Sequence, residues 1–176
     1  DSHLDCRALL IQIVALQVAQ LRATEATTNA LDNEIMAWHK KNEASQRLAT
    51  VPGIGYLTAS AIAATVPDPS FFRSGREFAA WVGLVPRQNS SGGKDRLGRI
   101  SKQGNRYIRR LLVIGATAML RYARTKTAPG ADWVNGLLER RPARLVTVAM
   151  ANKTARIAWA LLAKRETYRT PTVAAN

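Results

Sequence analysis

Residues 83–110 read Gly83-Leu-Val-Pro-Arg-Gln-Asn-Ser-Ser-Gly-Gly-Lys-Asp-Arg-Leu-Gly-Arg-Ile-Ser-Lys-Gln-Gly-Asn-Arg-Tyr-Ile-Arg-Arg110, and the rest of the chain is interpreted around this stretch. It holds five glycines, two adjacent serines and a single acid, Asp95. Its eight basic residues are Arg87, Lys94, Arg96, Arg99, Lys102, Arg106, Arg109 and Arg110. A cationic, glycine-rich loop that presents hydroxyl groups suits a binder of polyanions and also a phosphoryl-transfer enzyme.

Charge is distributed unevenly along the 176 residues, whose net charge is +14. Residues 1–70 carry five basic and seven acidic side chains, whereas residues 71–176 carry twenty-one basic and five acidic ones. Because every neutralised phosphate releases condensed counterions, a concentrated cationic surface favours nucleic acid as the partner over a merely soluble surface. The single cysteine, Cys6, excludes an internal disulfide and suits a reducing cytoplasm. No run approaches about 20 apolar residues, so we expect no membrane partner.

Residues 4–44 contain neither proline nor glycine and predict one long helix. Such a helix would be about 60 Å long, more than a small domain needs. A helix packed on its own domain is one interpretation. The favoured one is an arm, residues 1–45, that forms a coiled coil and makes the protein a homo-oligomer. Its seam would be Leu10, Val14, Gln17, Leu21, Thr24, Thr28, Leu31, Ile35 and Trp38.

A helix-hairpin-helix is predicted at about residues 48–66, around the turn Pro52-Gly-Ile-Gly55. The glycines Gly53 and Gly55 would let the backbone approach a phosphate, and the amides that open the second helix would point at that anion. Ile54 would fill the space between the helices. The alternative is an ordinary tight turn, in which glycine supplies a positive φ. The basic residues downstream favour phosphate binding.

The remaining segments read as helices with recognisable ends. Ser74 and Glu77 have the spacing of a capping box, and Gly83 would end that helix. Asn105 would cap a helix from 106 to about 124, Asp132 a short helix over 133–140, and a last helix would cover about 143–168. Their predicted inner residues include Phe71, Phe72, Phe78, Trp81, Ile108, Leu111, Leu112, Gly115, Met119, Tyr122, Leu145, Val148, Ala149, Ala155, Trp159 and Leu162.

The predicted fold class is all-α, because no segment shows a convincing period-2 alternation. A long, coiled-coil-like N-terminal helix would be followed by a compact helical domain, residues 46–170, with the helix-hairpin-helix near its start and a serine loop at 83–104. Residues 171–176 would form a disordered tail.

Elimination limits the chemistry that this chain can carry. The five acids of the basic half show no close pair, and His3 and His39 both lie on the predicted arm, so the sequence indicates no metal site, no zinc site and no serine–histidine pair. A serine nucleophile assisted by cations remains, at Ser90 or Ser91. Ser101 is a weaker candidate that would tether the turn before Gly104. Spacing alone favours the simpler interpretation, in which these serines donate hydrogen bonds to backbone phosphates.

A set of motifs in one order resembles the C-terminal half of DEDD-type insertion-sequence transposases, relatives of the Piv invertase. The resemblance covers about residues 48–168, and the arm is similar to the coiled coil that precedes this domain in the family. The motifs are Val51-Pro-Gly-Ile-Gly, Arg73-Ser-Gly-Arg-Glu-Phe-Ala-Ala-Trp-Val-Gly-Leu-Val-Pro-Arg-Gln, Ser90-Ser-Gly-Gly-Lys, Gly98-Arg-Ile-Ser-Lys-Gln-Gly-Asn-Arg-Tyr-Ile-Arg-Arg and Ala151-Asn-Lys.

The resemblance implies a transposase of a mobile element, nucleoid-associated in a bacterial cytoplasm. The family's serine acts on DNA as a covalent nucleophile and corresponds by position to Ser91, with Ser90 as the neighbour that a one-residue shift would select. The family holds metal, expected as Mg²⁺, on an N-terminal RuvC-like domain. That domain is missing here, so we expect a fragment that is inactive alone and has no cofactor of its own. Family members also work as oligomers with a structured noncoding RNA.

A different class of function remains open at this point. A non-enzymatic helix-hairpin-helix module could bind DNA through Gly53, Gly55 and the basic residues without any chemistry. Such a module does not need the Ser-Ser-Gly-Gly-Lys loop, and this loop therefore separates the two hypotheses. A purely structural oligomerisation segment would leave the basic half unexplained.

Overall fold

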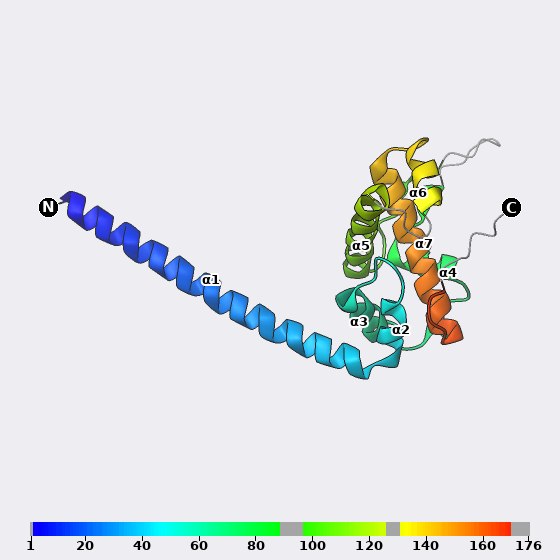
Figure 1. Ribbon diagram of the computed structural model, residues 1–176, viewed down its shortest axis with the longest axis horizontal. Coiled ribbons are helices and arrows are strands. Elements are labelled where there is room, and N and C mark those ends of the chain that lie inside the picture. Colours follow the sequence, from blue (N-terminus) through cyan, green and yellow to red (C-terminus); the bar gives the residue numbers. More distant parts are fainter. Residues whose placement is uncertain (1, 89–96, 126–130, 170–176) are drawn as a thin grey trace. The chain divides into compact units, whose positions relative to one another are not determined.

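The computed structural model describes residues 2–88, 97–125 and 131–169. Ser90, Ser91, Lys94, Arg96 and the predicted tail at 171–176 lie outside the described residues. The chain divides into two compact units, residues 1–38 and residues 39–176 (Figure 1). The predicted all-α class is confirmed, since seven α-helices and only two short strands lie in the described part.

Helix α1 runs from Ser2 to Lys41, close to the predicted 4–44. Three of its threonine hydroxyls, on Thr24, Thr27 and Thr28, donate hydrogen bonds of 2.8–2.9 Å to carbonyls four residues earlier, so these groups are satisfied within the helix. Many of its apolar side chains are exposed, with Leu16 at 71%. Contrary to expectation, α1 contains a window that could cross a membrane by length and composition, which alone are weak evidence.

Two short helices follow and form the predicted hairpin. Asn42 caps α2 (Glu43–Ala49), because its Oδ1 accepts a 2.9 Å hydrogen bond from the Ser45 amide. Helix α3 (Tyr56–Thr65) packs against α2. Ile54 in the turn between them is only 4% exposed, as predicted for a residue that fills the space between two helices.

The segment before the serine loop is built on aromatic packing. A 3₁₀ turn, η1 (Pro69–Phe71), precedes α4 (Gly75–Val82). Phe72, Phe78 and Trp81 pack with ring centroids 5.2–5.7 Å apart, whereas Phe71, predicted to be inner, is 74% exposed. The carboxyl of Asp68, the N-cap residue of η1, accepts hydrogen bonds from the backbone amide and the hydroxyl of Ser70. Both hydrogen bonds lower the pKa of Asp68, the one from the amide more strongly.

The capping of α4 was predicted with one error. The Ser74 hydroxyl accepts a hydrogen bond from the Glu77 amide, as expected. The Glu77 carboxylate, however, accepts from the amide of Arg73 at 2.7 Å, one residue before the cap, because Arg73 comes within its reach where the chain enters the helix. Gly83 ends α4 in the left-handed region, with φ +81°.

A small β-hairpin was not predicted. Strand β1 (Pro86–Gln88) pairs antiparallel with β2 (Leu97–Ile100), placing Pro86 opposite Ile100 and Gln88 opposite Leu97, with an irregularity between the two pairs. Strands of three and four residues are too short to show a period-2 pattern above background. In the sequence, Ser90 and Ser91 lie between these two strands.

Three helices complete the second unit: α5 (Arg106–Thr125), α6 (Ala131–Leu138) and α7 (Ala143–Lys164). Helix α7 contacts α2, α4, α5 and α6, so the core forms around it. Between α6 and α7, the Lys153 ammonium lies 4.1 Å from the centre of the Trp133 ring. Helix α6 begins one residue before the predicted cap, Asp132, and α7 ends four residues before the predicted Tyr168, at a left-handed Arg165.

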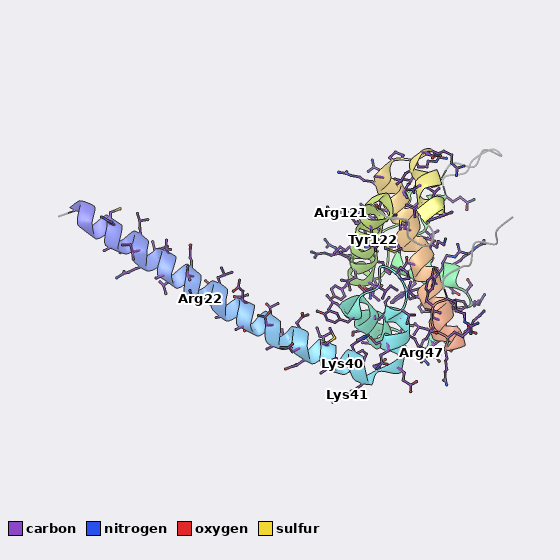
Figure 2. The ribbon with its side chains drawn as sticks, viewed as in Figure 1. Arg22, Lys40, Lys41, Arg47, Arg121 and Tyr122 are labelled. Carbon is purple, nitrogen blue, oxygen red and sulfur yellow. The ribbon has the colours of Figure 1, made fainter. Side chains whose placement is uncertain are left out.

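Three predicted inner residues of α5 and α7, Ala149 among them, are exposed instead. Tyr122 on α5, labelled in Figure 2, is 54% exposed, and Leu145 on α7 is 52% exposed. The buried faces overlap the predicted ones only in part, and small residues such as Ala116 and Ala158 also belong to them. The buried residues on α5 are Ile108, Leu112, Ala116, Leu120 and Ala123, and on α7 they are Val146, Thr147, Met150, Ala151, Thr154, Ala155, Ala158, Leu161 and Leu162.

Candidate nucleic-acid-binding site

The chain segment that leads from α4 into β1 is held by its carbonyl groups. Each of the five consecutive carbonyl oxygens of residues 81–85, which we call the carbonyl clamp, accepts a hydrogen bond from a residue later in the chain. The donors are the Asn105 amide to Trp81 (3.3 Å), Arg109 Nη1 to Val82 (2.7 Å), the Lys102 amide to Gly83 (3.1 Å), Asn152 Nδ2 to Leu84 (3.1 Å) and the Ser101 amide to Val85 (2.9 Å).

Two glycines make the close approach in this clamp possible. Gly83 and Gly104 have φ values of +81° and +95°, which side-chain-bearing residues rarely adopt. A Cβ atom at Gly83 would overlap the Gln103 carbonyl oxygen, and one at Gly104 would overlap that of Trp81. The end of α4 and the start of α5 are therefore packed backbone against backbone, which fixes both ends of the hairpin.

Ser101 behaves as its predicted weaker role requires. Its hydroxyl accepts a 3.4 Å hydrogen bond from the Gln103 amide, which tethers the turn before Gly104. Ser90 and Ser91 lie in sequence between β1 and β2, in a connection whose two ends are the paired residues Gln88 and Leu97. The clamp holds the strands that lead into and out of this connection.

Six of the predicted phosphate-binding cations lie in the described residues, and five of them are exposed. The exposed ones are Arg87, Arg99, Lys102, Arg106 and Arg110. Arg87 also donates from Nη2 to the Ser101 carbonyl at 3.3 Å. Arg109 differs, because it is half-buried and its guanidinium is part of the carbonyl clamp. Its observed contact is internal.

The first turn of α5 combines a cap with a cluster of cations. Asn105 caps this helix as predicted, since its Oδ1 accepts from the Ile108 amide at 3.0 Å. No acid occupies the first turn, although the helix dipole favours one there. Arg106 and Arg110 oppose the dipole and are exposed, so an external anion near this turn would be attracted by both the backbone and the side chains.

The two glycines of the helix-hairpin-helix differ in their surroundings. Gly53 has φ +85° and faces α5, where an added Cβ would lie 2.7 Å from the Met119 sulfur. A Cβ at Gly115 would in turn overlap the Gly53 carbonyl oxygen, so these two glycines let the turn between α2 and α3 pack closely on α5. Gly55 is exposed, with open space beside it, and is the N-cap residue before α3, which has no side-chain cap hydrogen bond. Gly55 fits the predicted phosphate contact better than Gly53.

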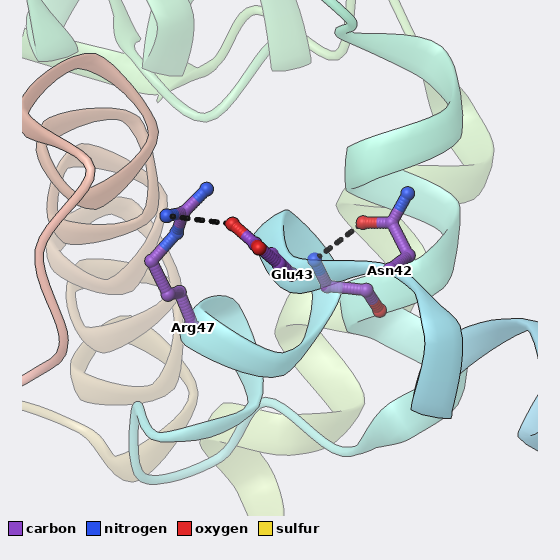
Figure 3. Close-up of polar contacts among 4 residues, drawn as sticks. Asn42, Glu43 and Arg47 are labelled. Atoms are coloured by element: carbon purple, nitrogen blue, oxygen red, sulfur yellow. Dashed lines mark hydrogen bonds and ion pairs between the residues drawn. The ribbon is translucent and has the colours of Figure 1, made fainter.

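A serine–histidine pair exists where none was predicted. His39 Nδ1 lies 2.7 Å from Ser45 Oγ, which is 3.3 Å from Ser60 Oγ. The pairing arises because the chain turns at Asn42 and brings α2 back beside His39. Figure 3 shows this turn, with the Asn42 cap and the 3.7 Å ion pair between Glu43 and Arg47. Ser45 is completely buried, so no substrate reaches its hydroxyl, and the pair stabilises the turn.

The described residues do not fit a metal ion. Within residues 2–88, 97–125 and 131–169, no three His, Cys, Asp or Glu side chains lie close enough together to bind one. The Mg²⁺ expected from the resemblance therefore has no such group of three side chains in this part of the chain.

Comparisons with known proteins agree with the motif set. Residues 45–129 match the family model described as "Transposase IS116/IS110/IS902 family". The chain is 51% identical, over 85% of its length, to a "Probable family 20 transposase" of Pseudomonas aeruginosa, covering 44% of that protein. It is 48% identical over 78% of its length to the "Transposase for insertion sequence element IS1111A" of Coxiella burnetii, covering 38%.

A more distant relative has a name that describes a different function. The chain is 31% identical, over 48% of its length, to the "Pilin gene-inverting protein" of Moraxella bovis, of which it covers 28%. The chain thus spans less than half the length of these curated relatives. The matched residues 45–129 run from α2 through α5 and include the hairpin and most of the carbonyl clamp. Residues 45–129 thus match the model of the Transposase IS116/IS110/IS902 family, and the chain is similar in sequence to proteins named as transposases of insertion elements.

Proposed function

We propose that this chain is the DNA-binding, serine-bearing part of a transposase that cuts and joins DNA for a mobile insertion element. The observation that carries the proposal is that the family match, residues 45–129, spans the serine-bearing connection together with the clamp that holds its ends. A non-enzymatic DNA-binding module would not need the two serines, or five fixed carbonyl groups in the segment that leads into the strand before them.

Ser91 is the proposed nucleophile, and Ser90 is the alternative. The Ser91 oxygen would attack a backbone phosphorus, forming a serine–phosphate ester. The bond from that phosphorus to one deoxyribose oxygen would break, and this oxygen would leave as a hydroxyl after receiving a proton. Exposed cations at the ends of the hairpin, such as Arg99 and Lys102, would hold the phosphate and stabilise the charge that builds on it.

The partners follow from the same surface. DNA phosphates would contact the exposed cations and the uncapped start of α3 at Gly55. A structured noncoding RNA would compete for these cations, because it presents the same phosphates. We also propose a homo-oligomer through the exposed apolar residues of α1, and action at the nucleoid in the cytoplasm. Metal-binding carboxylates would come from outside the described residues.

The test uses a chimera in which this chain replaces the matching region of the P. aeruginosa relative. The unmodified chimera should join donor and target DNA in the presence of Mg²⁺, and the 176-residue chain alone should not. Ser91→Ala should abolish joining while DNA binding persists, and Ser90→Ala should reduce it only partly. A chimera that binds but never joins DNA, or full joining by Ser91→Ala, would contradict the proposal.

A further inference from the structure

The turn before α4 directs one phenylalanine outward and its neighbour inward. Phe71 is 74% exposed, more than any other large apolar side chain in the described part of the second unit. Phe72, in contrast, packs against the rings of Phe78 and Trp81. A phenylalanine outside the core does not give the fold the stabilisation that burial of its ring would give. The ring of Phe71 is therefore available to a partner.

The turn that carries Phe71 is held firmly in place. Pro69 opens η1, and its ring locks its own φ. The carbonyl oxygen of Pro69 accepts two hydrogen bonds, from the Phe72 amide at 3.1 Å and from Trp159 Nε1 on α7 at 3.2 Å. A partner that binds Phe71 therefore has little additional backbone to order, which keeps the entropic cost of binding low.

Two arginines lie on the chain that follows Phe71. Arg73 is two residues further on, so the Cα atoms of these two residues are at most about 7 Å apart. Arg76 lies in the first turn of α4. The acids of this segment, Asp68 and Glu77, already accept hydrogen bonds from neighbouring residues of the same segment. The arginines are therefore the charged groups of this segment that remain for a partner.

A third arginine comes from α7, beside the residue that anchors the turn. Arg156 and Trp159, which donates to Pro69, are three residues apart and lie on the same side of α7. Helix α4 packs against α7 here (Figure 1), since a Cβ added to Gly75 would lie 3.0 Å from the Arg156 carbonyl oxygen. The segments packed on this part of α7 thus bring together four residues that we call the Phe71 surface: Phe71, Arg73, Arg76 and Arg156.

The Phe71 surface combines an apolar ring with free cationic groups. Its three arginines are exposed, and within residues 2–88, 97–125 and 131–169 no hydrogen bond or ion pair engages their guanidinium groups. A second copy of this surface would bring like charges together, which disfavours it as the occupant. An unpaired nucleic-acid strand is complementary to both features, because it presents phosphates together with the flat faces of its bases.

We propose that the Phe71 surface binds single-stranded DNA. An unpaired base stacks on the ring of Phe71, and the three arginines hold the neighbouring phosphates. A duplex would use only the arginines, because its bases are stacked inside the helix and present only their edges. None of these arginines belongs to the exposed cations of the hairpin and α5, so the surface is a second contact with DNA. The choice of DNA rests on the proposed function, because cutting and joining DNA exposes unpaired strands.

The experiment measures the affinity of the 176-residue chain for a fluorescent oligo-dT strand and for a duplex of equal length. We expect Phe71→Ala to weaken oligo-dT binding about 5-fold or more, with a much smaller effect on the duplex. Phe71→Tyr keeps an aromatic ring and should bind as the unchanged chain does. Leu145→Ala is the matched control, because Leu145 is an exposed apolar residue on another part of α7, and it should change neither affinity.

The phosphate contacts are tested by the salt dependence of oligo-dT binding. Arg156→Gln should reduce the slope of log affinity against log salt by about 0.7, which is the contribution of one phosphate contact on a single strand. Arg144→Gln is the control, since Arg144 is an exposed arginine about 18 Å away along α7. An equal reduction of the slope by Arg144→Gln would show a general attraction to the cationic protein and would overturn the inference.

Other results would overturn it as well. Unchanged oligo-dT binding by Phe71→Ala would remove the stacking role, and an equal loss with the duplex would show a general effect on DNA binding. A clearly larger loss with oligo-rU than with oligo-dT would assign the surface to RNA. Loss of self-association in Phe71→Ala would assign it to a second copy. Because the readout is binding, the inference survives if the chimera fails to join DNA, and joining by the chimera does not establish it.

Discussion

Asn152 on α7 donates a 3.1 Å hydrogen bond from Nδ2 to the carbonyl oxygen of Leu84, which lies 68 residues earlier in the chain. Asn152 lies beyond the matched residues 45–129, yet it fixes the segment that enters β1 inside them. The motif Ala151-Asn-Lys therefore has a physical role. It connects the last long helix of the protein to the hairpin that carries the serine connection.

Replacing Asn152 should destabilise the second unit. Leu84 is 1% exposed, so Asn152→Ala leaves a buried carbonyl without this donor, and we expect a loss of about 1–3 kcal/mol in the free energy of unfolding. Asn152→Asp should cost more, because a carboxylate would face a carbonyl that can only accept. Urea unfolding measures both variants. The control is Asn135→Ala, at an exposed position on α6. If all three variants were equally stable, the hydrogen bond would have no measurable role.

Gly104 and Gly136 offer a matched pair of glycine substitutions. Gly104→Ala places a side chain on a residue whose φ is +95°, and its Cβ would overlap the Trp81 carbonyl oxygen. We therefore expect the free energy of unfolding to fall by roughly 3 kcal/mol or more. Gly136→Ala meets nothing within 4 Å and lies inside α6, where alanine is favoured by up to about 1 kcal/mol. Thermal unfolding of the two variants should therefore shift in opposite directions. A Gly104→Ala protein as stable as the parent would contradict the backbone packing that defines the clamp.

Substitutions of Arg106 and Arg109 should have different effects, the first on DNA binding and the second on the stability of the fold. Arg106 is exposed, so Arg106→Gln should lower the salt dependence of DNA binding by about one phosphate contact and leave unfolding unchanged. Arg109→Gln removes the donor to the Val82 carbonyl and should lower stability by about 1–3 kcal/mol. The measurements are DNA titrations at several salt concentrations and urea unfolding of both variants. If Arg109→Gln changed only the salt dependence, its role would be phosphate binding after all.

The features that the sequence predicted well depend on neighbouring residues. The caps at Ser74 and Asn105, the left-handed Gly83 and the buried Ile54 each require only a few residues of local pattern, and each is confirmed. The long first helix was likewise predictable, because residues 4–44 contain neither proline nor glycine.

The features that the sequence did not predict arise from contacts between distant segments or from very short elements. The Asn152–Leu84 bond joins residues 68 positions apart, and no local pattern marks it. The hairpin strands are too short to show a period. Tyr122 was expected on the inner side of α5, where Ala123 is buried instead. Arg109 was grouped with its exposed neighbours because sequence does not reveal which arginine turns inward.

The most direct test of the central claim is to identify the residue that becomes linked to DNA. The chimera is incubated with Mg²⁺ and a donor DNA, denatured and digested, and the DNA-linked peptide is sequenced by mass spectrometry. We predict a phosphoester on Ser91, lost in Ser91→Ala and retained in Ser90→Ala. A linkage on another residue, or efficient joining by Ser91→Ala without any linkage in residues 89–96, would contradict the account.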